Sequence, residues 1–347
     1  MEDRPRERNH GDGATVEKER KLISRANGGE PLTGQDLCSS ADLGGITIVA
    51  IHAHPDDESI WTGLLLANAR RRGARVHVVT CTLGEEGEVI GEKYQSLQAD
   101  GNGMLGGYRI AELQRALDAL GLEQDPHLLG GVGTWRDSGM IGTPSIQRPD
   151  AFANENDEHN KTVQTAQLVA TLQELTPDIL VTYGPDGGYG HPDHVRAHRI
   201  THAAVNSGQL PSVKQILWAV TERSKVYAGL DGAVVPDGWS YPREGDVAMV
   251  DSEQVDFVLH GSREDVAAKQ RAMAAHATQV WVADGTVTDV NPHARTVPAG
   301  TPVLWCLSNL IAQPIISTES YEVGYTAEGV SQRFAEELLH GDVPPRP

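Results

Sequence analysis

The chain has 347 residues, 39% of them hydrophobic and 22% charged, which is typical of a globular protein, and no run approaches the roughly 20 apolar residues of a membrane span. Its formal net charge of −19, from 29 Lys and Arg against 48 Asp and Glu, argues against a nucleic-acid partner, because phosphate contacts need clustered basic side chains. Three widely spaced cysteines and a polar N-terminus without the apolar stretch of a secretion signal favour a cytoplasmic protein that has no membrane partner and no disulfide framework.

Strands and helices alternate along the first two thirds of the chain. Residues 1–44 come before this pattern, and their Gly, Ser, Asn and charge content predicts a disordered tail outside the domain. Apolar runs and periods then predict strands at residues 46–51, 75–82, 127–129, 178–183 and 214–220, and helices at residues 59–72, 108–120, 162–175 and 192–206. This alternation predicts an α/β fold with a Rossmann-like, mostly parallel sheet and helices on both faces.

The pattern becomes less regular after residue 222. A strand near residues 255–259, a helix over 262–277 and a strand near 303–307 are predicted. We therefore expect a core of residues 45–222, and an α+β portion of residues 223–347 that completes the same domain and its substrate pocket.

Two groups of His and Asp residues follow predicted strands. The first cluster, residues 54–58, reads His-Pro-Asp-Asp-Glu, and the second cluster, residues 191–194, reads His-Pro-Asp-His. Because the carboxyl ends of parallel strands meet at one edge of a sheet, we expect the two clusters to lie together. Imidazole and carboxylate are common ligands of Zn²⁺, and a catalytic zinc ion uses three protein ligands. The two clusters therefore predict a shared metal site.

Helix capping is the alternative explanation for these acids, since Asp and Glu are favoured before and within the first turn of a helix. Capping does not account for a His beside each acidic group, so we prefer the metal site. His194, His198 and His202 share one helical face, but the zincin pattern requires Glu after its first His, and residue 195 is Val. We expect His198 and His202 on the helix surface, and His276 packed outside the site.

Other catalytic patterns are weak. The Gly-rich residues 184–190 lack the Gly-Lys-Ser/Thr ending of a phosphate-binding loop, and no G-x-G-x-x-G follows the first strand. There is no G-x-S-x-G nucleophile pattern, and Cys81 lies in an apolar strand, where a core role is expected.

The two clusters together identify a resemblance to a known family. Residues 53–58 and 191–194 reproduce the A-H-P-D-D-E and H-P-D-H patterns of the LmbE-like (GlcNAc-PI de-N-acetylase) zinc deacetylases. Further segments resemble the mycothiol-biosynthesis branch, which deacetylates 1-D-myo-inosityl 2-acetamido-2-deoxy-α-D-glucopyranoside: residues 80–91, 105–110, 135–140, 187–194 and 274–280. The resemblance covers about residues 46–315. It implies a small sugar-inositol substrate, with the mycothiol S-conjugate amidase or another N-acyl-glucosamine deacetylase as the alternative.

The resemblance also implies residue roles. It implies that one zinc ion, or ferrous iron, is held by His54, Asp57 and His194. Asp56 matches the general base. Three further residues match the groups around the reacting amide, with His191 and Tyr189 facing the oxyanion and Asp193 orienting His191. Another three residues match family positions that hold or approach the sugar and inositol: Arg109, Asp137 and Glu88. Whether His191 or Asp56 protonates the leaving amine stays open.

Overall fold

The computed structural model describes residues 39, 41–122, 124–154 and 158–341. The described residues belong to one compact unit. The predicted tail, residues 1–44, lies mostly outside the described residues. Leu43 is buried, and its N–H donates to the carbonyl of Arg72 at 2.6 Å, so the packed part of the chain begins slightly before residue 45.

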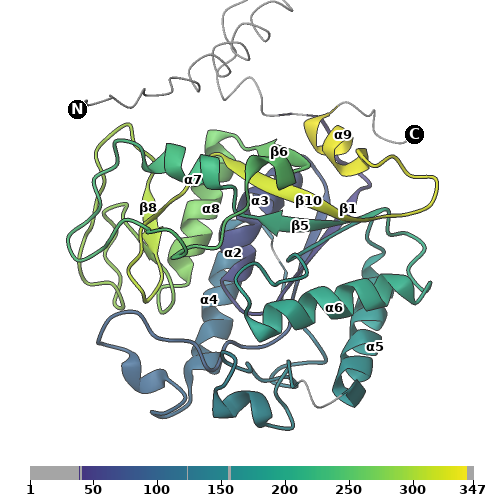
Figure 1. The fold of residues 1–347 in the computed structure, drawn as a ribbon, viewed down its shortest axis with the longest axis horizontal. Coiled ribbons are helices and arrows are strands. Elements are labelled where there is room, and N and C mark those ends of the chain that lie inside the picture. The colour runs from purple at the N-terminus through teal and green to yellow at the C-terminus, as the bar shows by residue number, and fades with distance from the viewer. Residues whose placement is uncertain (1–38, 40, 123, 155–157, 342–347) are drawn as a thin grey trace, which may run out of the picture. The chain divides into compact units, whose positions relative to one another are not determined.

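A seven-stranded sheet forms the centre of this unit (Figure 1). Five strands run parallel in the order β3-β2-β1-β4-β5: β1 (Thr47–His52), β2 (Arg75–Thr80), β3 (His127–Leu128), β4 (Ile179–Thr182) and β5 (Gln215–Val220). Two antiparallel strands extend the sheet beyond β5, first β10 (Thr318–Thr326) and then β6 (Phe257–His260). The prediction of a mostly parallel α/β sheet is confirmed.

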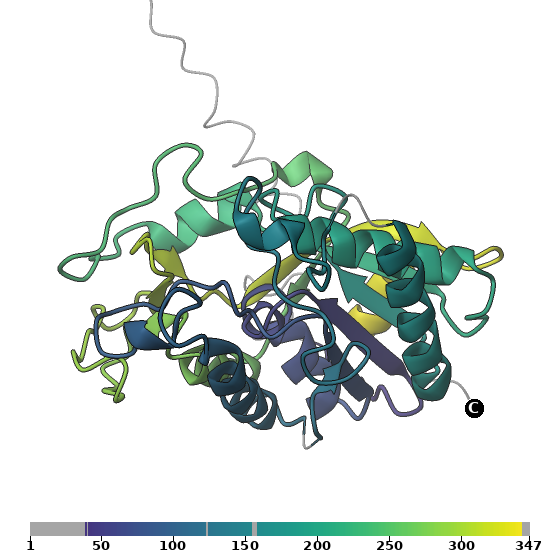
Figure 2. The same cartoon turned by 90° about the horizontal axis from the view of Figure 1, so that it is seen from below.

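Helices cover both faces of the sheet (Figures 1 and 2). The alternation of β1 explains this arrangement, because Ile48 and Ala50 belong to one buried apolar cluster and Val49 and Ile51 to another. The apolar core around Ile48 and Ala50 is completed by α3 (Gly63–Arg71), α4 (Leu105–Ala119), α8 (Arg263–Ala275) and α9 (Phe334–His340). The apolar core around Val49 and Ile51 is completed by α5 (Glu158–Leu175) and α6 (Pro192–Asn206).

The predicted helix over residues 59–72 is two helices. α2 (Asp57–Trp61) ends at Thr62, where the backbone leaves helical geometry, and α3 begins at Gly63. The break is stabilised by side chains, since Thr62 Oγ1 bonds to His52 Nε2 at 2.9 Å and Glu319 accepts the N–H groups of Leu64 and Leu65. A carboxylate at the start of α3 satisfies free N–H groups and favours the helix dipole.

Several elements of the C-terminal part were not predicted. They are α7 (Arg223–Leu230), β10, α9, β7 (Trp281–Val282) and β9 (Gln313–Pro314). The predicted strand near residues 303–307 is β8 (Leu304–Cys306), which pairs with β7 and β9 in a three-stranded sheet. Short 3-10 turns lie at Gln95–Leu97, Pro144–Gln147 and Ser252–Gln254. Among the described residues, no helix has both the length and the apolar character needed to cross a bilayer.

Candidate metal centre and active-site cavity

The two clusters meet because β1 and β4 are neighbouring parallel strands. The first cluster follows β1 and leads into α2, and the second cluster follows the loop after β4 and begins α6. Both therefore lie beyond the carboxyl edge of the sheet, as the strand-end rule predicts.

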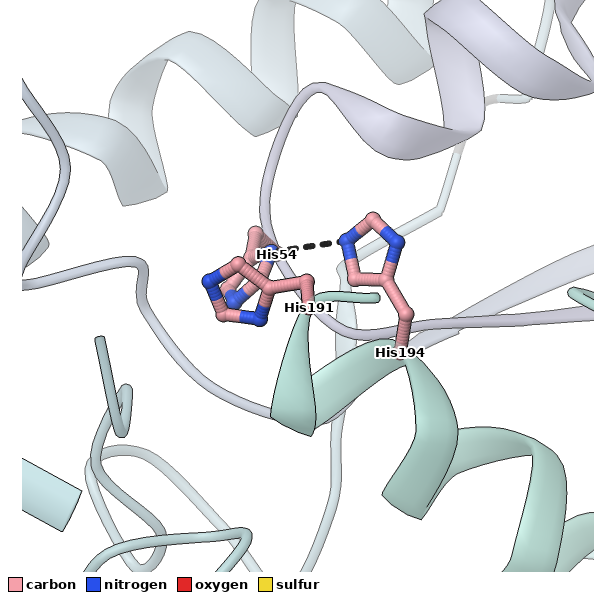
Figure 3. Close-up of side chains that lie close together, drawn as sticks. All are labelled: His54, His191 and His194. Carbon is pink, nitrogen blue, oxygen red and sulfur yellow. Dashed lines mark hydrogen bonds between the residues drawn. The ribbon is translucent and has the colours of Figure 1, made fainter. Parts of the chain in front are cut away.

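Three side chains converge on one point. His54 Nδ1 lies 3.3 Å from His194 Nε2 and 3.3 Å from Asp57 Oδ2, and His194 Nε2 lies 3.4 Å from that same oxygen. Figure 3 shows the two imidazole rings turned toward each other, with His191 beside them. A tetrahedral zinc ion with bonds near 2.0–2.1 Å places its ligand atoms about 3.3–3.4 Å apart. The chemistry and spacing of these three atoms fit one such ion.

Neighbouring groups fix the orientation of these side chains. His194 Nδ1 bonds to the carbonyl of Gly187 at 3.0 Å, which leaves Nε2 facing His54. The hydroxyl of Tyr183 donates to Asp57 Oδ2 at 2.7 Å and accepts the N–H of Ala53 at 2.8 Å. Contacts of this kind around a metal site set the tautomer and direction of its ligands.

Asp193 acts on a different histidine from the one expected. Its Oδ2 lies 3.3 Å from His54 Nε2 and accepts the N–H of Ser138 at 3.0 Å. Toward His191 it offers only its backbone N–H, which donates to Nδ1 at 3.2 Å. The expectation that the Asp193 carboxylate orients His191 is therefore corrected. Asp193 is fully buried in the first turn of α6, which directs its side chain inward toward His54.

Two other groupings of possible ligands share His54. His54, His191 and His194 form one, and His54, Asp137 and Asp193 form the other, each with ligand atoms within 4.8 Å of one another. The ligand atoms of His54, Asp57 and His194 lie closer together, 3.3–3.4 Å apart. We therefore take His191 and Asp137 as neighbours of the proposed metal site and not as ligands. Burial is the main cause that lowers the pKa of His191 to about 3, and the neighbouring His54 and His194 act in the same direction.

The Asp56 carboxylate pairs with Arg109 and lines the cavity together with His54 and Asp57. Its Oδ2 lies 3.0 Å from Arg109 Nη2, and it makes no side-chain capping bond to α2 in the described part of the chain. Burial raises the pKa of Asp56 to about 6, against the opposing charge of Arg109. In the second cluster the capping side chain is that of His191, and Asp193 lies in the first turn of α6, where a carboxylate also favours the helix dipole.

A cavity of about 600 Å³ opens over these groups. Its wall includes six further residues that were predicted to take part in the site: Asp56, Glu88, Arg109, Asp137, Tyr189 and His191. Glu88 accepts a hydrogen bond from Ser308 Oγ at 2.9 Å, and Tyr189 is half exposed. The wall also includes residues that the sequence reasoning missed: Lys225, Gln279, Ser308, Asn309 and Glu319. Of these residues, only Gln279 lies in a segment that resembles the family, residues 274–280, so only Gln279 could have been found from the sequence.

Arg109 and Asp137 were expected to hold substrate hydroxyls, and both line the cavity. Arg109 is buried, however, and its guanidinium bonds to Asp56 and to the carbonyls of Gly84 and Pro55. Asp137 is also buried and lies 3.6 Å from His54 Nε2. Burial alone would raise the pKa of Asp137, but His54 holds it well below the usual range. Neighbouring protein groups thus hold both side chains in place at the wall of the cavity.

Comparison with known proteins identifies the family. Residues 49–205 match the family model described as PIG-L, GlcNAc-PI de-N-acetylase. A protein of Corynebacterium jeikeium (strain K411), named 1D-myo-inositol 2-acetamido-2-deoxy-alpha-D-glucopyranoside deacetylase, is 55% identical over 85% of this chain and 96% of its own. The chain belongs to the GlcNAc-PI de-N-acetylase family. A relative of the same name from Nocardia farcinica (strain IFM 10152) is 45% identical over 81% of this chain and 90% of its own.

The match to the GlcNAc-PI de-N-acetylase model includes both clusters and ends within α6. The cavity wall made by Gln279, Ser308 and Asn309 lies beyond it. A more distant solved structure, the zinc inhibited form of teicoplanin deacetylase Orf2, is 17% identical, covers 82% of this chain and 99% of that chain, and has a TM-score of 0.45.

Proposed function

We propose that this member of the GlcNAc-PI de-N-acetylase family is a metal-dependent hydrolase that removes the N-acetyl group of 1-D-myo-inosityl 2-acetamido-2-deoxy-α-D-glucopyranoside, giving acetate and the free amine. The observation that carries the proposal is the triangle of His54 Nδ1, Asp57 Oδ2 and His194 Nε2, with sides of 3.3–3.4 Å, beside a separate carboxylate at the wall of a cavity. The names of relatives about half identical to the chain supply the substrate. The mycothiol pathway is proposed from the sequence segments that resemble the mycothiol-biosynthesis branch.

Zinc is the metal we assign to His54, Asp57 and His194, and ferrous iron suits the same ligands. Such an ion supplies a Lewis acid for the amide carbonyl and makes water a nucleophile near neutral pH. The ligand set carries one negative charge against the two positive charges of the metal, so the site keeps a net positive charge for a developing oxyanion.

The side chains around this position divide the remaining work. Arg109 is paired with Asp56 Oδ2, so we assign proton transfer to Oδ1, which takes the proton of the attacking water and passes it to the leaving nitrogen. His191 and Tyr189 line the cavity beside His54 and are the groups we assign to the oxyanion. His191 Nδ1 accepts the N–H of Asp193 at 3.2 Å, so we assign its Nε2 to donate a hydrogen bond to the oxyanion.

The size and lining of the cavity support a small polar substrate. A cavity of about 600 Å³ lies within the range of small-molecule sites. Glu88, Ser308 and Asn309 lie in its wall and offer hydrogen-bond partners for sugar or inositol hydroxyls. We further propose a cytoplasmic site of action, in line with the buried, unpaired Cys81 and Cys306 among the described residues.

The proposal is tested by measuring acetate release from a panel of N-acyl sugars, with and without chelator. The inosityl N-acetylglucosaminide should give the highest kcat/KM, chelation should abolish the reaction, and added Zn²⁺ or Fe²⁺ should restore it. Asp56→Asn should keep the metal and lose at least about a hundredfold in kcat. No acetate from any substrate, or full activity in Asp56→Asn, would refute the proposal. A higher kcat/KM on a mycothiol S-conjugate would reassign the protein as the amidase.

A further inference from the structure

The backbone of Asp56 is strained. Its φ is 123° and its ψ is −31°, and only Thr176 and Leu310 share a positive φ among the other non-glycine residues that the structure describes. An L side chain disfavours this region, and such a conformation persists only where surrounding contacts enforce it. The strain lies at the residue proposed to move the proton, so the contacts that maintain it bear on the chemistry.

Glu58 supplies one of these contacts. Its side chain is fully buried two residues after Asp56, and its Oε2 accepts the N–H of Asp56 at 3.0 Å. The other oxygen, Oε1, accepts hydrogen bonds from Ser59 Oγ and from His276 Nε2, the latter at 2.7 Å. Three donors thus hold one carboxylate, and one of them is the backbone of the strained residue.

His276 reaches this carboxylate from a distant part of the sequence. It is fully buried at the end of α8, which packs against α2, α3 and α4. The segment that follows is also fixed, since Thr278 donates to Glu112 of α4 through its N–H and its Oγ1 at 2.9 and 2.6 Å. His276 was expected to be a packed histidine outside the site. It is packed, but it bonds to a residue of the first cluster.

We propose that Glu58 and His276 are positioning residues for Asp56, an inference that rests on the proposed function. His276 holds the Glu58 carboxylate at the angle at which Oε2 receives the Asp56 N–H. This bond, with the ion pair to Arg109, directs the Asp56 carboxylate into the cavity. Asp57 is held separately, because its Oδ2 accepts the N–H of His54 at 2.9 Å and the hydroxyl of Tyr183. Loss of His276 should therefore displace the base and leave the metal ligands in place.

The test compares two substitutions of His276 in the full-length, metal-loaded protein. His276→Leu removes the donor to Glu58 at similar volume, and we expect kcat to fall at least about tenfold, with KM changed less than about threefold and metal affinity unchanged. His276→Gln carries an amide N–H in the place of Nε2 and should recover most of the lost kcat. Equal losses in both variants, or an unchanged kcat in His276→Leu, would overturn the inference.

Thr278→Val is the matched control, because it removes the two buried hydrogen bonds of Thr278 Oγ1, to Glu112 and from Gln279, without touching Glu58. It should lower the melting temperature and keep kcat, and a kcat loss equal to that of His276→Leu would overturn the inference. A double-mutant cycle separates positioning from general damage. In an Asp56→Asn background, His276→Leu should leave the residual rate unchanged, whereas a further tenfold loss would contradict action through Asp56. If the unsubstituted protein releases no acetate, the proposed function fails first.

Discussion

Tyr183 stacks face to face on His194, with ring centroids 4.0 Å apart and 12° between the ring planes. The same side chain donates its hydroxyl proton to Asp57 Oδ2 at 2.7 Å. One residue at the end of β4 therefore orients two of the three assigned metal ligands, one through its ring and the other through its hydroxyl. Both contacts lie in fully buried surroundings, where hydrogen bonds are strengthened by the low local dielectric.

Tyr183→Phe is expected to weaken metal binding by about 10–100-fold, since it keeps the stacked ring and removes the hydroxyl that donates to Asp57 and accepts the N–H of Ala53. Competition with a chromophoric chelator measures this dissociation constant directly. Tyr321→Phe is the matched control, because Tyr321 is equally buried and donates to Glu319, away from the assigned ligands. An equal loss of metal affinity in both variants, or none in Tyr183→Phe, would contradict the role assigned to Tyr183.

Asp193→Asn should likewise reduce metal affinity, because Asp193 Oδ2 faces His54 Nε2 and its negative charge raises the basicity of the ligand. We expect a loss of about tenfold in affinity, with kcat largely recovered at saturating metal. The measurement is a titration of acetate release against free metal concentration. A reduced kcat with unchanged metal affinity would instead return Asp193 to the role of orienting His191.

The fold and the meeting of the two clusters could be predicted because both depend on local patterns. β1 is a run of β-branched residues, and parallel strands bring their carboxyl ends to one edge. The direction of the Asp193 side chain could not be predicted, because it depends on how the first turn of α6 packs against the end of β1. The pairing of Glu58 with His276 is equally invisible in the sequence, since it spans 218 positions and depends on the packing of α8.

The break at Thr62 and the C-terminal cavity wall were missed for a similar reason. The apolar period of residues 59–72 continues through Thr62, and the break becomes favourable only when Glu319 of β10 caps the second helix. β10 itself pairs between β5 and β6, far from both in sequence. No local pattern announces such an insertion, so Glu319 and its neighbours could not be placed at the site.

Arg109→Met should destabilise the protein and lower kcat. The guanidinium is buried and pairs with Asp56, so its removal leaves an uncompensated buried carboxylate, which typically costs about 3–5 kcal/mol. Urea unfolding gives the stability change, and steady-state kinetics give kcat and KM. Arg109→Lys keeps the charge, should retain more stability than Arg109→Met, and serves as the matched comparison. A rise in KM alone, with stability and kcat intact, would support the original expectation that Arg109 holds substrate hydroxyls.

The ion pair between Asp265 and Arg71 should make stability depend on pH. Arg71 Nε lies 2.7 Å from Asp265 Oδ1, and this carboxylate also accepts from Asn68 and Ser262. Burial alone would raise the pKa of Asp265, but these partners lower it below its usual value. A carboxylate with a lowered pKa in the folded state stabilises the fold above its unfolded pKa, about 3.9, and loses this contribution as the pH falls toward the folded value.

Asp265→Asn should therefore reduce the free energy of unfolding near pH 7, and the difference from the unsubstituted protein should shrink as the pH falls below about 4. Urea unfolding of both proteins from about pH 7 to about pH 3 measures this difference. Both proteins carry the same proposed metal site, so the effect of its titration on stability is equal in both and cancels in the difference. Asp150→Asn is the matched control, because the pair of Arg148 and Asp150 is about half exposed and solvent screens it. A difference for Asp265→Asn that stays constant or grows in acid would show that its effect arises from packing and not from charge.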